Sequence, residues 1–304
     1  MCLRSQGVPM EHTRRSVLAF CATAAFSGCL SVSGTEDREE DAVMNVAHAG
    51  GKFLRPENTV EAVEHAVEVG ADAVEIDLHL SADERIVVIH DETVDRTTDG
   101  EGRVDKMTVE EMKQLDAGYA FPPPLTEGFE EHQERYDHVP DDDDLFRGEG
   151  IEIPTFVEVL EALPNDFPLV LGVKRGSAPP ERLAELLREY DRVEHTVVGG
   201  FDDTYLEDVR RIIPEVETGL GAGKSRQFLL TVRANERRYE PPAEVLFPPH
   251  DLVRESFIKR AHRNGMRVIP WTINDRDELK RFVEMGADGV ITDDPVLLGR
   301  ILGR

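Results

Sequence analysis

The sequence predicts an α/β fold in which eight strands and their helices close into a (β/α)8 TIM-type barrel. From Val43 onward, short runs rich in Val, Ile and Leu alternate with amphipathic stretches, and this alternation repeats eight times. Strands that alternate with helices pair in parallel, and a parallel sheet of eight strands can close on itself. Hydrophobic residues make up 40% of the chain, which is enough for such a core and argues against wholesale disorder.

The expected strands are short β-branched runs, and the expected helices have apolar side chains at helical spacing. The eight strands are Met44–His48, Ala73–Leu80, Leu169–Val173, Thr196–Gly199, Glu215–Gly219, Glu244–Phe247, Arg267–Thr272 and Gly289–Thr292. The helices between them are Asn58–Gly70, Pro180–Tyr190, Asp203–Ile212, Leu252–Asn264 and Arg276–Met285. Residues 118–150 interrupt the rhythm with three consecutive prolines and four consecutive aspartates. We expect a surface insertion there, which either covers the mouth of the barrel or is simply solvated.

The residues before the barrel are typical of an export signal. Arg14 and Arg15 precede an uncharged run from Ser16 to Gly28 that is too short to span a bilayer, and paired arginines indicate the twin-arginine (Tat) route. The segment that ends at Cys29 resembles a lipobox, although simple cleavage or an uncleaved anchor is also possible. We therefore expect residues 1–28 to be a Tat-type signal with a lipobox and residues 29–42 to be a polar tether. The barrel of residues 43–304 would then be held by a lipid anchor at the outer face of the cell membrane, or be secreted.

The charge of the chain limits its partners. The formal net charge is −26, and only seven of the 35 basic residues are lysines. Such a chain repels phosphate backbones, so nucleic acid is not an expected partner. Many carboxylates with little lysine are typical of a halophilic protein, and the alternative is an ordinary acidic protein. All three cysteines precede residue 30, so thiolate chemistry is not available in the barrel.

Polar side chains gather where the expected strands end. Glu75, Asp77 and His79 share one side of their strand, and His48 and His90 end two neighbouring runs. Two carboxylates on one side of a strand can hold a hard divalent cation through oxygen. Two histidines can deprotonate an attacking oxygen and protonate a leaving one, since imidazole titrates near neutrality. The pattern therefore indicates metal-assisted acid–base chemistry at the C-terminal rim of the barrel.

Several motifs give the chain a likeness to a known family over essentially Val43 to the C-terminus. In order and spacing, it resembles the glycerophosphodiester phosphodiesterase family. The motifs are Ala47-His48, Pro56-Glu57-Asn58-Thr59, the Glu75-Ile76-Asp77 strand, His90-Asp91 with the residues up to Thr98, Leu115-Asp116-Ala117-Gly118, Ile153-Pro154-Thr155, Trp271-Thr272-Ile273-Asn274, and Gly286 to Asp293.

This resemblance implies a barrel of the phospholipase-C-like phosphodiesterase type and a small-molecule substrate. The implied enzyme hydrolyses a glycerophosphodiester to glycerol phosphate and an alcohol, with Mg²⁺ or Ca²⁺. His48 and His90 match the acid–base pair, Glu75 and Asp77 match metal ligands, Lys174 matches a phosphate-side lysine, and Trp271 matches an aromatic wall near the glycerol. Glu57 and Asn58 are expected at the substrate, although Asn58 could instead cap the following helix.

Two positions depart from the family pattern. Ala49 stands where the family has a phosphate-binding arginine, and Gly172 stands where it has a third metal-binding glutamate. Lys52, Arg55 or Lys174 could compensate for the first loss, and Glu57, His79 or Glu152 for the second. The departures keep two other functions open: a decayed, headgroup-binding lipoprotein, and a phospholipase D-type hydrolase of intact phospholipids. The oligomeric state stays open as well.

Overall fold

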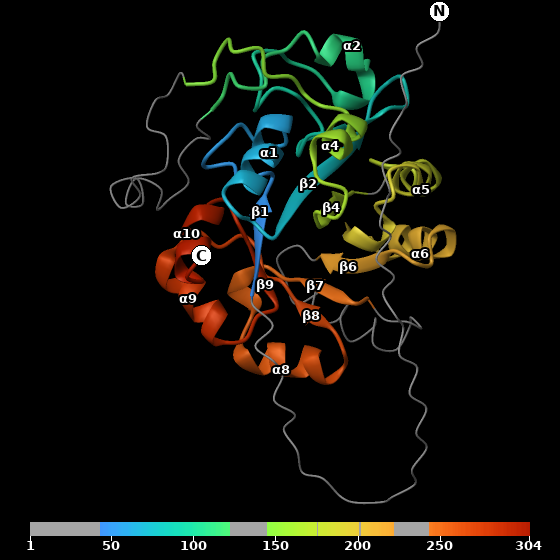
Figure 1. The fold of residues 1–304 in the computed structure, drawn as a ribbon. Helices are drawn as coiled ribbons and strands as arrows, with labels where there is room; N and C mark the ends of the chain where they lie inside the picture. The colour runs from blue at the N-terminus through green and yellow to red at the C-terminus, as the bar shows by residue number, and fades with distance from the viewer. Residues whose placement is uncertain (1–42, 122–144, 175, 201, 222–242) are drawn as a thin grey trace, which may run out of the picture. The chain divides into compact units, whose positions relative to one another are not determined.

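Eight parallel strands form the centre of the structure, in the order β8-β7-β6-β5-β4-β2-β1-β9 (Figure 1). The N–H groups of Asp288 and Ile291 donate to the carbonyl oxygens of Val268 and Pro270, each at 3.0 Å. These bonds bring the first and last strands of this order together, so the barrel is nearly closed. The predicted (β/α)8 architecture is confirmed. The strands are β1 (Met44–His48), β2 (Ala73–Leu80), β4 (Leu169–Val173), β5 (Thr196–Gly200), β6 (Glu217–Gly221), β7 (Val245–Phe247), β8 (Arg267–Val268) and β9 (Gly289–Thr292).

The computed structural model describes residues 43–121, 145–174, 176–200, 202–221 and 243–304. The predicted signal (1–28), the predicted tether (29–42) and residues 122–144 of the predicted insertion lie outside this part of the chain, so these assignments stay predictions. Within the described residues, no helix is both long and apolar enough to cross a membrane.

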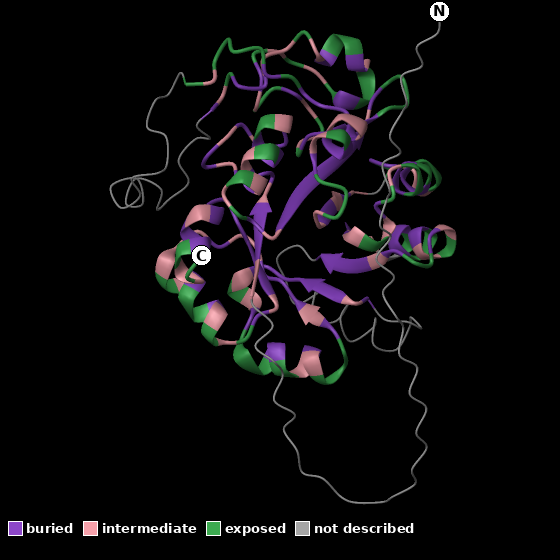
Figure 2. Ribbon diagram, viewed as in Figure 1, coloured by how far each residue is buried: buried purple, intermediate pink, exposed green. Residues whose placement is uncertain are grey.

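In the described part of the chain, the helices other than α2 surround the barrel and bury one face each against it (Figure 2), whereas α2 packs into a small second core. Helix α1 shows how the sequence sets such an element. Thr59 caps its N-terminus by accepting a hydrogen bond from the Ala62 N–H, and the buried face contains Ala62, Val63 and Ala66. The helices are α1 (Val60–Glu68), α2 (Val109–Met112), α4 (Phe156–Ala162), α5 (Pro180–Glu189), α6 (Asp203–Ile212), α8 (Glu255–Arg263), α9 (Arg276–Glu284) and α10 (Pro295–Ile301).

One strand lies outside the barrel order. β3 (Ile86–Val88) pairs antiparallel with the end of β2 and carries the chain away from the barrel. Residues 87–117 and 151–153 then build a small second core around Val87, Val104 and Met112. This extension positions His90, which follows β3 after Ile89.

Several predicted elements have different ends in the structure, and the larger differences have local causes. The helix expected at Leu252–Asn264 begins at Glu255, because His250–Leu252 forms a short 3-10 helix before it. The strand expected at Arg267–Thr272 ends at Val268, because Pro270 has no N–H to donate. The strand expected at Glu215–Gly219 begins at Glu217, after the turn that follows α6. The helix expected from Asn58 begins at Val60, since Asn58 has a φ of 60°, in the left-handed region.

Candidate active site

A cavity of about 210 Å³ opens at the C-terminal ends of the barrel strands. One part of its wall is polar and the rest is apolar, with glycines where β4, β5 and β6 end. Six of the predicted site residues line it together, as expected for side chains that follow parallel strands in one barrel. The lining residues are His48, Glu75, Asp77, His90, Val170, Leu171, Gly172, Lys174, Gly199, Gly200, Gly221, Phe247, Trp271 and Ile291.

His48 ends β1 and is held by a carboxylate that follows β9. Its Nδ1 lies 2.5 Å from Oδ1 of Asp293, and its Nε2 lies 3.9 Å from Oε2 of Glu75. The other Asp293 oxygen accepts a hydrogen bond from the Asn274 amide at 2.6 Å. Burial alone would lower the pKa of His48, but the contact with Asp293, helped by Glu75, raises it to about 9. Nδ1 therefore donates to Asp293, and Nε2 is the ring atom left for substrate.

The buried carboxylates of Glu75 and Asp77 lie side by side next to Gly172. A Cβ atom on Gly172 would lie 2.8 Å from Glu75 Oε1 and 2.9 Å from Asp77 Oδ1. Burial and the neighbouring Asp77 charge raise the pKa of Glu75 to about 8, against the opposing effect of His48. Two crowded carboxylates of this kind are stabilised by a shared positive charge.

This donor set fits a hard divalent cation. Two carboxylates can hold Mg²⁺ or Ca²⁺ when water or substrate oxygens complete its coordination. Among the described residues, no cluster of three His, Cys, Asp or Glu side chains suited to a metal is present. The candidates for a third ligand are engaged elsewhere: Glu57 binds Arg96, His79 lies 3.2 Å from the His90 carbonyl oxygen, and Glu152 binds Lys113.

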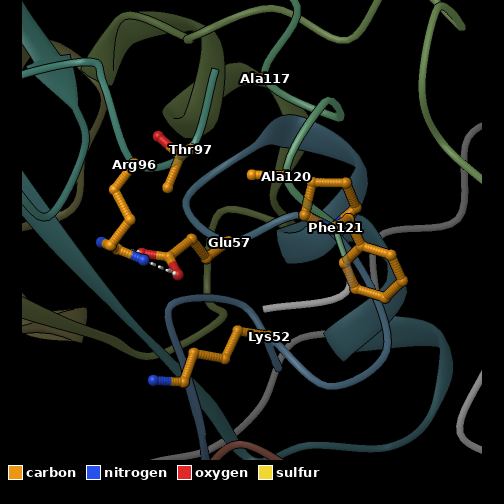
Figure 3. Close-up of a pocket in the computed structure, with 8 residues that line it drawn as sticks. Lys52, Glu57, Arg96, Thr97, Ala117, Ala120 and Phe121 are labelled. Carbon is orange, nitrogen blue, oxygen red and sulfur yellow. Dashed lines mark hydrogen bonds and ion pairs between the residues drawn. The ribbon is translucent and has the colours of Figure 1, made fainter. Parts of the chain in front are cut away.

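His90 has a similar carboxylate partner, within a larger ionic network. Its Nδ1 lies 2.6 Å from Asp91 Oδ1, and Asp91 Oδ2 accepts from Arg96 Nε at 2.6 Å. The two terminal nitrogens of Arg96 donate to both oxygens of Glu57, at 2.8 and 2.7 Å (Figure 3). The network links the loop after β1 to the loop after β3, and so fixes His90 relative to the barrel.

The remaining predicted residues have definite positions. Lys174 Nζ donates to the His90 carbonyl oxygen at 2.6 Å, and Trp271 Nε1 donates to the Phe247 carbonyl oxygen at 2.8 Å, both at the cavity. Asn58 does not cap α1; its amide nitrogen lies 3.3 Å from Asp77 Oδ2, and its amide oxygen accepts from the Asp77 N–H. Glu57 and Asn58 do not line the cavity, so their contact with substrate stays a prediction.

Comparisons with known proteins identify the family of the chain. Residues 48–297 match the Glycerophosphoryl diester phosphodiesterase family. The chain belongs to this family. A curated relative from Caldanaerobacter subterraneus subsp. tengcongensis, named glycerophosphodiester phosphodiesterase, is 34% identical over 260 residues, which cover 83% of this chain and 95% of the relative. The predicted family is therefore confirmed, and with it the class of enzyme, a phosphoric diester hydrolase.

Two solved structures share the fold of this chain. The glycerophosphodiester phosphodiesterase of Agrobacterium tumefaciens is 25% identical, with a TM-score of 0.68 and coverage of 85% of this chain and 99% of that one. A phosphodiesterase of Oleispira antarctica, solved with the product sn-glycerol-3-phosphate, is 23% identical, with a TM-score of 0.65 and coverage of 85% and 96%.

Sequence reasoning gave no role to several residues that shape this site. Asp293, Asn274, Asp91 and Arg96 belong to the quoted motifs. The two aspartates contact the histidines, and Asn274 and Arg96 contact those aspartates; none of the four lines the cavity. One signal was available: Asp293 follows the last strand of the barrel, at the end where working residues collect.

Proposed function

We propose that this chain hydrolyses glycerophosphodiesters to glycerol phosphate and an alcohol. The observation that carries the proposal is the meeting of two aspartate-paired histidines and a carboxylate pair in one cavity. The family and the named relatives support the same activity. Nothing in the comparisons favours a decayed binding protein or a hydrolase of intact phospholipids.

The two histidines supply the proton transfers. Hydrolysis of a phosphodiester requires removal of a proton from the attacking oxygen and delivery of one to the leaving oxygen. In both His48 and His90 an aspartate holds Nδ1, which fixes the ring orientation and leaves Nε2 for exchange with substrate. A pair of imidazoles, one protonated and one neutral, performs both transfers without further groups.

Glu75 and Asp77 are the residues that would hold the divalent cation, Mg²⁺ or Ca²⁺. When bound, the cation would supply positive charge to the phosphate oxygens as a Lewis acid. The lack of a side chain at Gly172 lets both carboxylates approach the backbone of β4 together. Lys174 adds a second positive charge at the rim, and Trp271 with Phe247 offers an apolar surface for the glycerol carbons.

A substrate panel with and without chelator tests the proposal. The purified chain, given Mg²⁺ or Ca²⁺, should release glycerol phosphate from glycerophosphocholine, glycerophosphoethanolamine or glycerophosphoglycerol, and excess chelator should stop the release. His48→Ala and His90→Ala should abolish turnover. His262→Ala is a matched control, because His262 also contacts an aspartate, Asp288 at 2.7 Å, but lies on α8 away from the cavity.

The same panel separates the alternatives. Release of a headgroup from phospholipid vesicles but not from deacylated diesters would indicate a phospholipase D-type hydrolase. Binding of diesters without turnover under any of these conditions would indicate the decayed binding protein, and would refute the hydrolase.

We also propose that the enzyme works outside the cell membrane, exported by the Tat route and anchored through a lipid on Cys29. The twin arginines and the lipobox-like segment support this proposal. Mass spectrometry of the mature N-terminus tests it: a lipid-modified Cys29 is expected, and an intact Arg14-Arg15 leader on the mature protein would contradict it.

A further inference from the structure

The proposed substrate is an anion, yet the polar wall of the cavity carries the carboxylates of Glu75 and Asp77. Binding a phosphodiester there requires cationic side chains at the rim in addition to the metal. The resemblance places a family arginine at position 49, where this chain has alanine. Four basic side chains in the described part of the chain are close enough in sequence or structure to be considered: Lys52, Arg55, Arg96 and Lys174.

Two of these four residues, Arg96 and Arg55, already contact other groups of the protein. Arg96 binds both oxygens of Glu57 and one oxygen of Asp91, so two carboxylates neutralise its charge. Arg55 donates to the carbonyl oxygen of Leu54 and lies over the Phe146 ring, 5.4 Å from its centre. Neither guanidinium lines the barrel cavity; of the four residues Lys174 lines it, whereas Lys52 lines a separate small pocket and is considered for its position beside Asp293.

A tight turn brings Lys52 beside Asp293, the residue that holds His48. Gly50 and Gly51 have φ values of 85° and 90°, and the Gly51 N–H donates to the His48 carbonyl oxygen at 2.7 Å. A Cβ atom on Gly50 would lie 2.5 Å from Ala62 Cβ, so the turn packs directly against α1. The Phe53 N–H then donates to the Asp293 carbonyl oxygen, which fixes the loop beside the residue that holds His48.

The Lys52 ammonium lies next to the acid–base machinery and has donors to spare. Its Nζ is 3.6 Å from Asp293 Oδ1, the same oxygen that contacts His48. An ammonium has three N–H donors, and this contact is longer than a good hydrogen bond. The Lys52 side chain is 26% exposed. It lines a small pocket together with Glu57 and Arg96, and its amine lies on the same side of this pocket as the Glu57–Arg96 ion pair (Figure 3).

We propose that Lys52 binds the phosphate group of the substrate, together with Lys174, in place of the arginine that is absent at position 49. This inference rests on the proposed function and concerns the same site. Lys52 lies beside Asp293 on the loop after β1, and Lys174 follows β4 and lines the cavity, so the two ammonium groups come from different elements. A lysine binds phosphate as a point charge and lacks the fork of arginine, which favours looser binding of the diester.

The test compares Lys52→Met with Lys52→Arg and with Lys106→Met. Lys106 is a matched control, because its side chain is 74% exposed on the short 3-10 helix Val104–Lys106, so its loss changes the net charge equally at a remote place. The measurements are kcat and KM for a glycerophosphodiester and the Kd of sn-glycerol-3-phosphate by calorimetry, at fixed salt and cation. Thermal unfolding of each variant verifies that it is folded.

Lys52→Met should raise KM and the product Kd by about 10–100-fold, the effect of one charge-assisted hydrogen bond. Lys52→Arg should stay within about threefold of the original protein, since it keeps the charge. Equal product Kd values in Lys52→Met and Lys106→Met would overturn the inference. A shifted pH profile of kcat with unchanged Kd would also overturn it, because Lys52 would then act only through Asp293 and His48. If the unmodified protein neither binds nor hydrolyses diesters, that result contradicts the proposed function itself rather than the role of Lys52.

Discussion

Two aspartates determine what the two histidines of this site can do. Asp293 lies under His48 and Asp91 under His90, each within 2.6 Å of the Nδ1 atom of its histidine. A histidine without such a partner rotates and changes tautomer freely, whereas these rings have one donor fixed and the other nitrogen available. Much of the chemistry proposed for the cavity therefore depends on carboxylates that do not line it.

Asp293→Asn should lower kcat by about 100-fold or more, the usual contribution of a positioned acid–base group. Asparagine keeps the size of the side chain but cannot stabilise a protonated His48, so the elevated pKa of His48 would also be lost. Steady-state kinetics with a glycerophosphodiester gives the answer. Asp275→Asn is the control, because Asp275 caps α9 and asparagine caps equally well. Unchanged kcat in Asp293→Asn would show that His48 needs no carboxylate.

Gly172→Ala should weaken cation binding about tenfold. The added methyl group would lie within 3 Å of one oxygen of Glu75 and one of Asp77, so both carboxylates would be pushed from their common position. The shift of the thermal unfolding midpoint on titration with Ca²⁺ or Mg²⁺ measures this affinity. Gly299→Ala, in α10, is the control, since its nearest neighbouring atom would be 3.8 Å away. Equal affinities in the two variants would place the cation elsewhere.

For single residues, the sequence predicted the side chains that line the cavity, but it did not predict the residues that hold the two histidines in position. His48, Glu75, Asp77, His90, Lys174 and Trp271 were predictable because parallel strands deliver their C-terminal side chains to one rim. The pairing of His48 with Asp293 spans 245 residues and depends on ring closure, which spacing along the chain does not reveal.

At the scale of elements, the loops after β1 and β3 work as one unit. Glu57 belongs to the first loop and Arg96 to the second, and their bidentate contact ties the small second core to the barrel. Pattern reasoning found the strands and helices that have clear periodicity. It failed at their ends, where single residues such as Pro270 and Asn58 decide the backbone conformation.

Arg96→Met should destabilise the protein by about 2 kcal/mol at neutral pH, because Glu57 is left buried without its partner. The partial exposure of Arg96 keeps the effect below that of a fully buried pair. Urea unfolding of the variant and the original protein, at several pH values, measures it.

The difference between the two proteins should shrink as pH falls from about 5 toward 2. Burial opposes ionisation of Asp91, but Arg96 and His90 lower its pKa to about 2, and Arg96 likewise lowers the pKa of Glu57 against burial. Carboxylates with lowered folded-state pKa values stabilise the fold above their unfolded pKa and lose this effect in acid. A difference that stayed constant with pH would show that Arg96 acts through packing alone.

For the whole molecule, the net charge of −26 opposes the entry of an anionic substrate. Removal of residues 1–28, with three Arg and one Glu, would take the charge to −28. Surface potentials of this sign repel anions over about 10 Å at 0.1 M salt and over about 3 Å at 1 M. The lysine-poor composition agrees with use at high salt, and the halophilic setting stays a prediction.

Raising NaCl from about 0.1 to about 1 M should increase kcat/KM for glycerophosphoglycerol several-fold, as screening relieves this repulsion. Glycerophosphocholine carries no net charge and is the control, so its kcat/KM should change much less. Rates are measured at saturating divalent cation. An equal response of both substrates would mean that salt acts on the protein and not on the approach of the substrate.

The contact between His48 and Asp293 joins the first strand of the barrel to the residue that follows its last strand. A chain that has folded from only one end lacks the oriented imidazole, however complete its other elements are. Contacts between such distant residues form late and slowly. Hydrolysis is therefore a property of the finished barrel, and the return of activity during refolding reports the moment at which the two ends of the fold meet.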